Sequence, residues 1–191
     1  MKRLSKSFVL LVNVFLGLVF LSSCQNNPPV HQLFLPEGFS YEVYVDSIGE
    51  KVRHMAVNEN GVLYAKFKRQ SEQGVLAGIK DFDKDGHYDS LIKFGQYHVP
   101  QKGNYSTGAR IHKGYLYYSN HLNVYRVKLD ADRIVPTGPH ERVVIDDHEH
   151  GSHEHIAKPI AFDDQGNLYV PFGTPNNACQ TPKRTPLTPG Q

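Results

Sequence analysis

The hydrophobic and polar positions along the chain predict short strands and no amphipathic helix. From residue 41 onward, runs of four to six residues rich in Val, Leu, Ile, Tyr and Phe alternate with clusters of Gly, Asn and Asp, which is the pattern of strands separated by turns. The predicted strands are Tyr41–Val45, Val62–Phe67, Val75–Lys80, Leu91–Phe94, Tyr115–Ser119, Val124–Lys128, Arg142–Ile145 and Leu168–Phe172. We therefore expect an all-β fold.

Three segments of the chain repeat one pattern. Each has an Ala, four variable residues, a Gly, one variable residue and then Leu-Tyr, and they span Ala56–Tyr64, Ala109–Tyr117 and Ala161–Tyr169. Their glycines lie 53 and 52 residues apart, a period that suits the four-stranded blades of a β-propeller. The Gly would close a tight turn that needs positive φ, and the Leu and Tyr would face opposite sides of the next strand. Similar hairpins in a β-sandwich are the alternative.

The length of the chain predicts an incomplete ring of blades. About three repeat periods fit after the first 34 residues, whereas propellers typically have four to eight blades. We therefore expect this sequence to be the N-terminal part of a longer protein, in which further blades cover the sheet edge that three blades alone would expose.

The first 24 residues combine a positive start, an apolar run and a cysteine. Lys2, Arg3 and Lys6 precede the apolar run Phe8–Leu21, which is long enough for a signal peptide and short for a membrane-spanning helix. The following Leu21-Ser22-Ser23-Cys24 resembles the lipobox of bacterial lipoproteins. This resemblance implies that residues 1–23 are a signal peptide and that Cys24 carries the lipid.

This N-terminus predicts where the protein is held. Residues 24–34 would form a lipidated tether, since several acyl chains hold a protein stably on a membrane. Gln25 replaces the Asp that often marks inner-membrane retention, so we expect an exported protein anchored in the cell envelope, at the outer membrane or on the periplasmic side. An ordinary secretory signal followed by a chance cysteine, or an uncleaved anchor, is the alternative.

Loss of the signal peptide also changes the charge and the cysteine count. Three of the 21 Lys and Arg residues leave while all 19 acidic residues stay, so the formal net charge falls from +2 to −1. This balance gives no reason to expect a nucleic-acid partner. Cys24 is committed to lipid, which leaves Cys179 as a single cysteine whose disulfide partner we expect in further sequence.

An acidic segment follows the third predicted strand. Asp81, Asp83, Asp85 and Asp89, with Gly86 among them, have the spacing of the first half of a calcium loop. Ile92 stands where an EF-hand needs a bidentate Glu, and the neighbouring segments are predicted strands. We prefer an Asp- and Gly-rich hairpin turn that needs no ion, and keep calcium binding by these four carboxylates as the alternative.

Two other segments carry candidate chemistry. Residues 146–155 contain two His-x-His pairs, which suit zinc or copper, although a solvated loop is the preferred interpretation. The strand-like Tyr115–Tyr118 could stack on a carbohydrate, but aromatic residues on strands more often pack a core.

Three segments of this chain resemble one family of enzymes. His153–Gly173, Leu35–Val43 and Asp81–Gly86 resemble the glucose/sorbosone dehydrogenase family, and the resemblance extends from about Leu35 to Gln180. It implies that residues 35–191 belong to a six-bladed β-propeller of which about three blades are present here. It also implies the cofactor pyrroloquinoline quinone (PQQ), which several members use, and calcium beside it.

The resemblance assigns one catalytic residue. His155, five residues before Ile160, occupies the position of the family's general base, and imidazole is suited to taking a proton from an alcohol near neutral pH. Lys158 stands where sorbosone-type members often have Arg. Most residues that contact PQQ come from later blades of the family, so no cofactor-binding residue is assigned in this chain.

Two functional hypotheses follow. The first is a membrane-anchored aldose or sorbosone-type dehydrogenase, in which a sugar hydroxyl gives hydride to PQQ and His155 is the base. The second is a non-catalytic β-propeller lipoprotein that binds glycans or a protein partner. Neither the particular sugar nor the electron acceptor follows from the sequence.

Overall fold

The computed structural model describes residues 33–97, 108–146 and 157–173, and the chain divides into two compact units, Met1–Tyr41 and Glu42–Gln191. The described part of the first unit contains a tight turn in which the Phe39 amide donates to the Pro36 carbonyl over 3.2 Å. The signal peptide 1–23, Cys24 and Cys179 lie outside the described residues. No helix long and apolar enough to cross a membrane is present in the three described ranges.

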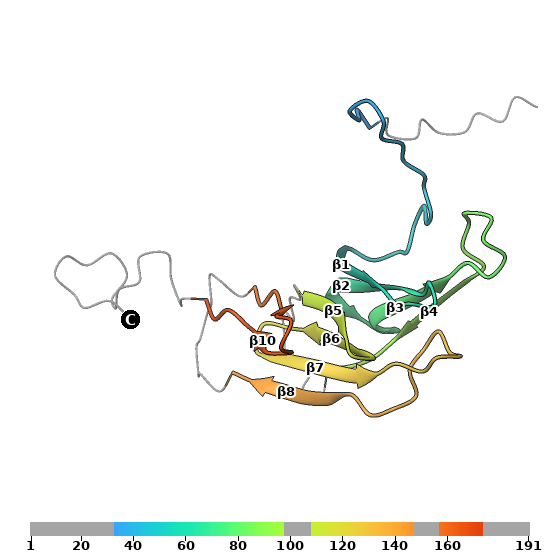
Figure 1. The fold of residues 1–191 in the computed structure, drawn as a ribbon. Coiled ribbons are helices and arrows are strands. Elements are labelled where there is room, and N and C mark those ends of the chain that lie inside the picture. The colour runs from blue at the N-terminus through green and yellow to red at the C-terminus, as the bar shows by residue number, and fades with distance from the viewer. Residues whose placement is uncertain (1–32, 98–107, 147–156, 174–191) are drawn as a thin grey trace, which may run out of the picture. The chain divides into compact units, whose positions relative to one another are not determined.

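The second unit is built from antiparallel strands (Figure 1). The first sheet has the order β1 (Val52–Val57), β2 (Leu63–Ser71), β3 (Gly74–Lys80), β4 (Ser90–Phe94). The second sheet has the order β5 (Gly108–His112), β6 (Tyr115–Ser119), β7 (Asn123–Lys128), β8 (Glu141–Ile145). A separate hairpin pairs β9 (Ala161–Phe162) with β10 (Leu168–Tyr169). The all-β prediction is confirmed, and the two sequential four-stranded sheets are consistent with propeller blades.

Most predicted strands are present, and the differences have a physical origin. β2, β3, β4, β6, β7, β8 and a shorter β10 match predicted segments. The prediction of a strand at Tyr41–Val45 is wrong: these residues pair with no described strand, and Tyr44 and Val45 pack against a face of the first sheet. The strands that the pattern missed are β1, β5 and β9, which are short or mix apolar with His and Arg side chains.

Each of the three repeated segments, Ala56–Tyr64, Ala109–Tyr117 and Ala161–Tyr169, forms a hairpin. The Ala lies in the first strand of each hairpin, and Leu-Tyr begins or lies in the second strand. The intervening glycines Gly61, Gly114 and Gly166 have φ values of 74°, 75° and 89°. This confirms that the glycines serve tight turns with positive φ.

The three turns are not identical. In the first and third hairpins, the Asn58 and Asp163 side chains accept the backbone N–H of the residue four positions later, at 2.8 and 2.7 Å. The second hairpin has Ile111 at that position and uses a tighter turn in which both Lys113 and Gly114 have positive φ. Ala56 and Ala161 therefore pair with the Tyr of the motif, whereas Ala109 pairs with the next residue.

The Leu and Tyr of each repeat face opposite directions, as predicted. Tyr64 and Leu116 share the core between the first and second sheets. Tyr117 belongs to the core that the second sheet shares with Leu168 of the third hairpin. In the first two repeats the Tyr faces the following unit, and in the second and third repeats the Leu faces the preceding one, so the described units stack in one sense. Tyr169, which has no following unit in the described residues, is 56% exposed.

Replacement of the second turn glycine tests the backbone requirement. No heavy atom lies within 4 Å of a Cβ added at Gly114, so Gly114→Ala suffers only from its positive φ of 75°. We expect a loss of about 1–2 kcal/mol in the free energy of unfolding, measured by urea denaturation. Gly138→Ala is the matched control, because its Cβ also meets nothing and its φ is not left-handed. Equal losses of unfolding free energy in the two variants would contradict the requirement for a positive φ at Gly114.

Candidate functional site

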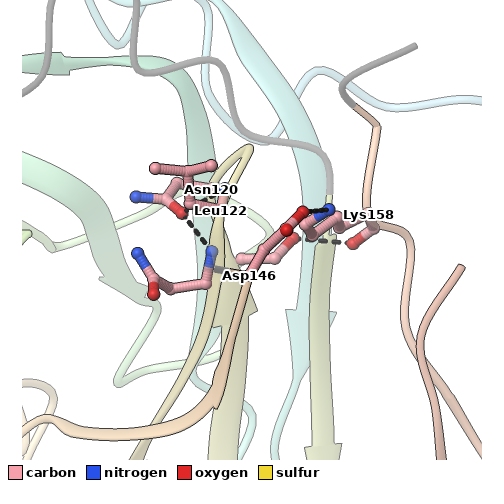
Figure 2. A network of polar contacts seen from close by, with 6 residues as sticks. Asn120, Leu122, Asp146 and Lys158 are labelled. Atoms are coloured by element: carbon pink, nitrogen blue, oxygen red, sulfur yellow. Dashed lines mark hydrogen bonds and ion pairs between the residues drawn. The ribbon is translucent and has the colours of Figure 1, made fainter. Parts of the chain in front are cut away.

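A buried ion pair joins the two sides of the segment that carries the predicted base. Asp146 follows β8 and Lys158 precedes β9, and the Lys158 Nζ lies 2.9 Å from an Asp146 carboxylate oxygen. The side chains are only 3% and 6% exposed, and Figure 2 shows them pointing toward each other. A buried pair of this kind needs further polar contacts, because both charges have lost water.

Those further contacts come from the second sheet. The Ser119 hydroxyl donates to the Lys158 carbonyl over 2.7 Å, and the Asp146 amide donates to the Leu122 carbonyl over 2.8 Å. The Asn120 side-chain oxygen accepts the amides of Leu122 and Asn123 at 2.9 and 2.6 Å (Figure 2). The end of β6 therefore holds Lys158, and the turn between β6 and β7 holds Asp146.

The approach of Lys158 to the second sheet depends on a glycine at the start of β5. A Cβ at Gly108 would lie 2.5 Å from the Ser119 hydroxyl and 2.7 Å from the Lys158 carbonyl. The Lys158 ammonium also lies 4.4 Å from the centre of the Phe172 ring, a cation–π contact. Backbone, ion pair and ring together hold Lys158 in one place.

His155 itself, the predicted base, lies outside the described residues, as do His148, His150 and His153. Its catalytic role and the His-x-His metal site therefore stay predictions. Asp146, which the sequence placed in the group of potential ligands, is committed to Lys158 in the structure.

The acidic loop between β3 and β4 brings together three of the four predicted carboxylates. One carboxylate oxygen from each of Asp81, Asp83 and Asp89 lies within 4.8 Å of the others. Asp85 is not in this group, and its carboxylate accepts the His87 amide at 2.8 Å. The structure thus offers a cation three convergent carboxylates, and calcium binding stays a prediction.

The same loop is also held by its own hydrogen bonds. Asp81 accepts the amides of Lys84 and Gly86 at 2.6 and 3.0 Å, and Asp89 accepts that of Phe82 at 2.6 Å. Partial desolvation raises the pKa of Asp81, but the hydrogen bonds from Gly86 and Lys84 outweigh it and hold this pKa below its ordinary value. Backbone amides therefore stabilise the turn, and both interpretations of the loop, a hairpin turn that needs no ion and a calcium site, stay predictions.

Basic side chains occur on the adjoining edge strands of the two sheets. β1 contacts β5, and each carries an exposed arginine, Arg53 and Arg110. Burial lowers the pKa of His54, and the charges of Arg53 and Arg110 lower it further. In the described part of the chain neither arginine forms an ion pair. The Arg110 Nε donates to the Ile160 carbonyl over 3.4 Å, so this guanidinium is partly engaged within the chain.

The Tyr-rich strand β6 is part of the core. Tyr117 and Tyr118 are both buried and belong to different core clusters on the two sides of the sheet. The Arg126 guanidinium covers the Tyr115 ring at 4.8 Å. The preference for core packing over a carbohydrate platform is confirmed.

Lys66 is a buried residue to which sequence reasoning gave no role. It lies in β2 and is completely inaccessible to solvent. The sequence carries one signal. Lys66 lies two residues after Tyr64 on the same strand, so both side chains share the face that packs in the core.

Comparison with known proteins gives similarity in structure only. The chain is similar to the PQQ domain of pyranose dehydrogenase from Coprinopsis cinerea, with a TM-score of 0.51 and 13% identity over 68% of this chain and 29% of that chain. It is also similar to a Trichoderma reesei carbohydrate-active enzyme of family AA12, with a TM-score of 0.49 and 16% identity over 66% of this chain and 31% of that one.

The first of these similarities shows the fold and no more, since the identity is low. The chain spans less than a third of the length of that PQQ domain. No protein-family model matches the sequence, and no curated protein matches it. The expected fold type is supported, whereas the glucose/sorbosone dehydrogenase family itself stays a prediction.

Removal of one charge from the buried ion pair tests its importance. Asp146→Asn leaves the Lys158 ammonium buried without its carboxylate, and we expect a loss of about 3–5 kcal/mol in the free energy of unfolding. Glu141→Gln is the matched control, because it breaks the Arg126–Glu141 pair, whose side chains are 36% and 48% exposed. Exposed pairs contribute little. Both variants are measured by urea denaturation. Equal shifts of the two unfolding midpoints would contradict the importance of the buried ion pair.

Proposed function

We propose that this chain belongs to a membrane-anchored sugar dehydrogenase-like protein that oxidises a sugar hydroxyl with PQQ. The structural similarity to the PQQ domain of a pyranose dehydrogenase is the observation that carries this proposal. The sequence segments that resemble the glucose/sorbosone dehydrogenase family support it independently, because they include the His155 position. Cys24 supplies the lipid anchor, which places the protein on the cell envelope.

His155 is the general base in this proposal. It would accept the proton of the sugar hydroxyl while the carbon that bears this hydroxyl loses a hydride, and PQQ, when bound, would supply the hydride acceptor. The described residues contribute the support: Lys158, three residues after His155, is held by Asp146, Ser119 and the Phe172 ring. A well-fixed neighbour limits the positions open to a catalytic side chain.

The described residues are also compatible with the charge of the cofactor. PQQ carries carboxylates, and the edge formed by β1 and β5 presents Arg53 and Arg110 without ion-pair partners among the described residues. The individual residues that bind PQQ stay unassigned.

The assay for this function is dye-linked oxidation of a panel of aldoses by the full-length protein reconstituted with PQQ and calcium. We expect activity that falls by 10²-fold or more, about the contribution of a general base, in His155→Ala. His31→Ala, in the tether, is the control and should keep full activity. Absence of both turnover and quinone binding across the panel would favour the alternative, a non-catalytic β-propeller lipoprotein that binds glycans or a protein partner.

The acidic loop gives a separate test of calcium binding. We expect Asp83→Asn to weaken calcium binding measured by isothermal titration calorimetry, since Asp83 belongs to the convergent group and Ca²⁺ prefers carboxylate oxygens. Asp85→Asn is the matched control, because its carboxylate lies outside that group and binds the His87 amide instead. Equal weakening by both substitutions would show that the loop does not bind calcium in the arrangement seen here.

A further inference from the structure

Lys66 lies in the packed interface between the first and second sheets. It is completely buried and pairs across the first sheet with His54 of β1 and Leu76 of β3. Leu76 belongs to the core that the two sheets share. The Lys66 Nζ also lies 5.9 Å from the centre of the Tyr118 ring, which the second sheet contributes.

The contacts of Lys66 suit an uncharged amine. Its Nζ donates to the carbonyls of Phe67 and Val75, each at 3.1 Å. A neutral amine has two N–H donors, and these two carbonyls use both of them. An ammonium has a third donor, and the further groups near Nζ are the rings of Tyr97 at 5.0 Å and Tyr118.

Among the described residues, no acidic side chain forms an ion pair that would balance a charge on Lys66. Lys66 forms no ion pair with the described residues, unlike the other buried lysine, Lys158. The titratable side chains around it are His54, Tyr64, Tyr97, Tyr118, Tyr125 and His140. Charged groups act on these neighbours, Arg53 and Arg110 on His54 and Asp130 on Tyr64, and none of the three forms an ion pair with Lys66. Tyr and His side chains are not anions near neutral pH, and burial raises the pKa of Tyr64 to about 12 and also raises that of Tyr118. Burial without a counter-charge lowers the pKa of Lys66 well below its ordinary value.

We propose that Lys66 is an acid-sensitive switch in the interface between the first two sheets. The neutral amine allows the sheets to pack, and protonation of Nζ on acidification places an uncompensated charge in that interface and loosens it. This proposal is independent of the dehydrogenase function, because it concerns residues that the proposed chemistry does not use.

The direction of the pH dependence follows from proton linkage. In the unfolded chain Lys66 has an ordinary lysine pKa, so between its lowered native pKa and about pH 10 the unfolded state binds one more proton than the native state. The folding equilibrium constant therefore rises with pH by up to about tenfold per pH unit in that window. Below the native pKa both states carry the proton, and this contribution no longer changes.

The test is a pH series of urea unfolding on the full chain, for the parent protein and Lys66→Met. Met matches the length of the lysine stem and cannot be protonated, so we expect Lys66→Met to lose most of the rise in stability between about pH 7 and pH 10. Lys93→Met is the matched control: Lys93 is partly buried beside Glu50, at 3.5 Å, and its removal should leave the rise intact. An unchanged pH dependence in Lys66→Met would overturn the proposal.

A second measurement decides the matter even where the variant fails to fold. In the parent protein with ¹³C-labelled lysine, the Cε resonance of Lys66 should titrate at a markedly lower pH than the other lysine resonances. Amide exchange of Leu76 and Leu116, which lie on the two sides of the interface, should accelerate relative to their intrinsic rates as that resonance shifts. Titration of every lysine together near its ordinary pKa would overturn the proposal.

Discussion

The packing of one sheet face on the next is the interaction on which the described structure depends. Between the first and second sheets it is made by ten buried side chains, which are Val62, Tyr64, Val75, Leu76, Phe94, Tyr97, Leu116, Tyr118, Tyr125 and Val127. Full burial of one large apolar side chain stabilises by about 1.5–3 kcal/mol, so this core outweighs any single polar contact in the chain. Both four-stranded sheets carry buried apolar side chains on their two faces, so each packs against a neighbouring segment on either side.

The two buried lysines of the described residues are accommodated in different ways. Lys158 is buried beside Asp146, and hydrogen bonds from the turn between β6 and β7 support the pair. Lys66 is buried beside two carbonyls and two aromatic rings, and none of the described acidic residues forms an ion pair with it. The two lysines therefore have different physical consequences: the first fixes a position three residues after the predicted base in the sequence, and the second, in our proposal, makes a core sensitive to protonation.

The two candidate sites differ in how much of them a single sequence can predict. The acidic loop is local, so the spacing of its aspartates was visible, but the backbone decided that Asp85 turns away while Asp81, Asp83 and Asp89 converge. The Lys158–Asp146 pair joins residues 12 positions apart and also requires Ser119, 39 positions from Lys158. A contact between such distant positions depends on how two sheets stack, and no local pattern predicts it.

The sequence by itself determined the strands, the three repeated hairpins and the opposite orientation of Leu and Tyr, because alternation and turn glycines act over a few residues. Only the tertiary structure decided the register of each hairpin, the absence of a strand at Tyr41–Val45 and the burial of Lys66. Ile111 in place of Asn or Asp shortened the second turn and shifted its pairing by one residue, whereas Tyr41–Val45 found no strand to pair with. A strand needs a partner and a buried side chain needs a neighbouring sheet, and both are supplied by residues far away in the sequence.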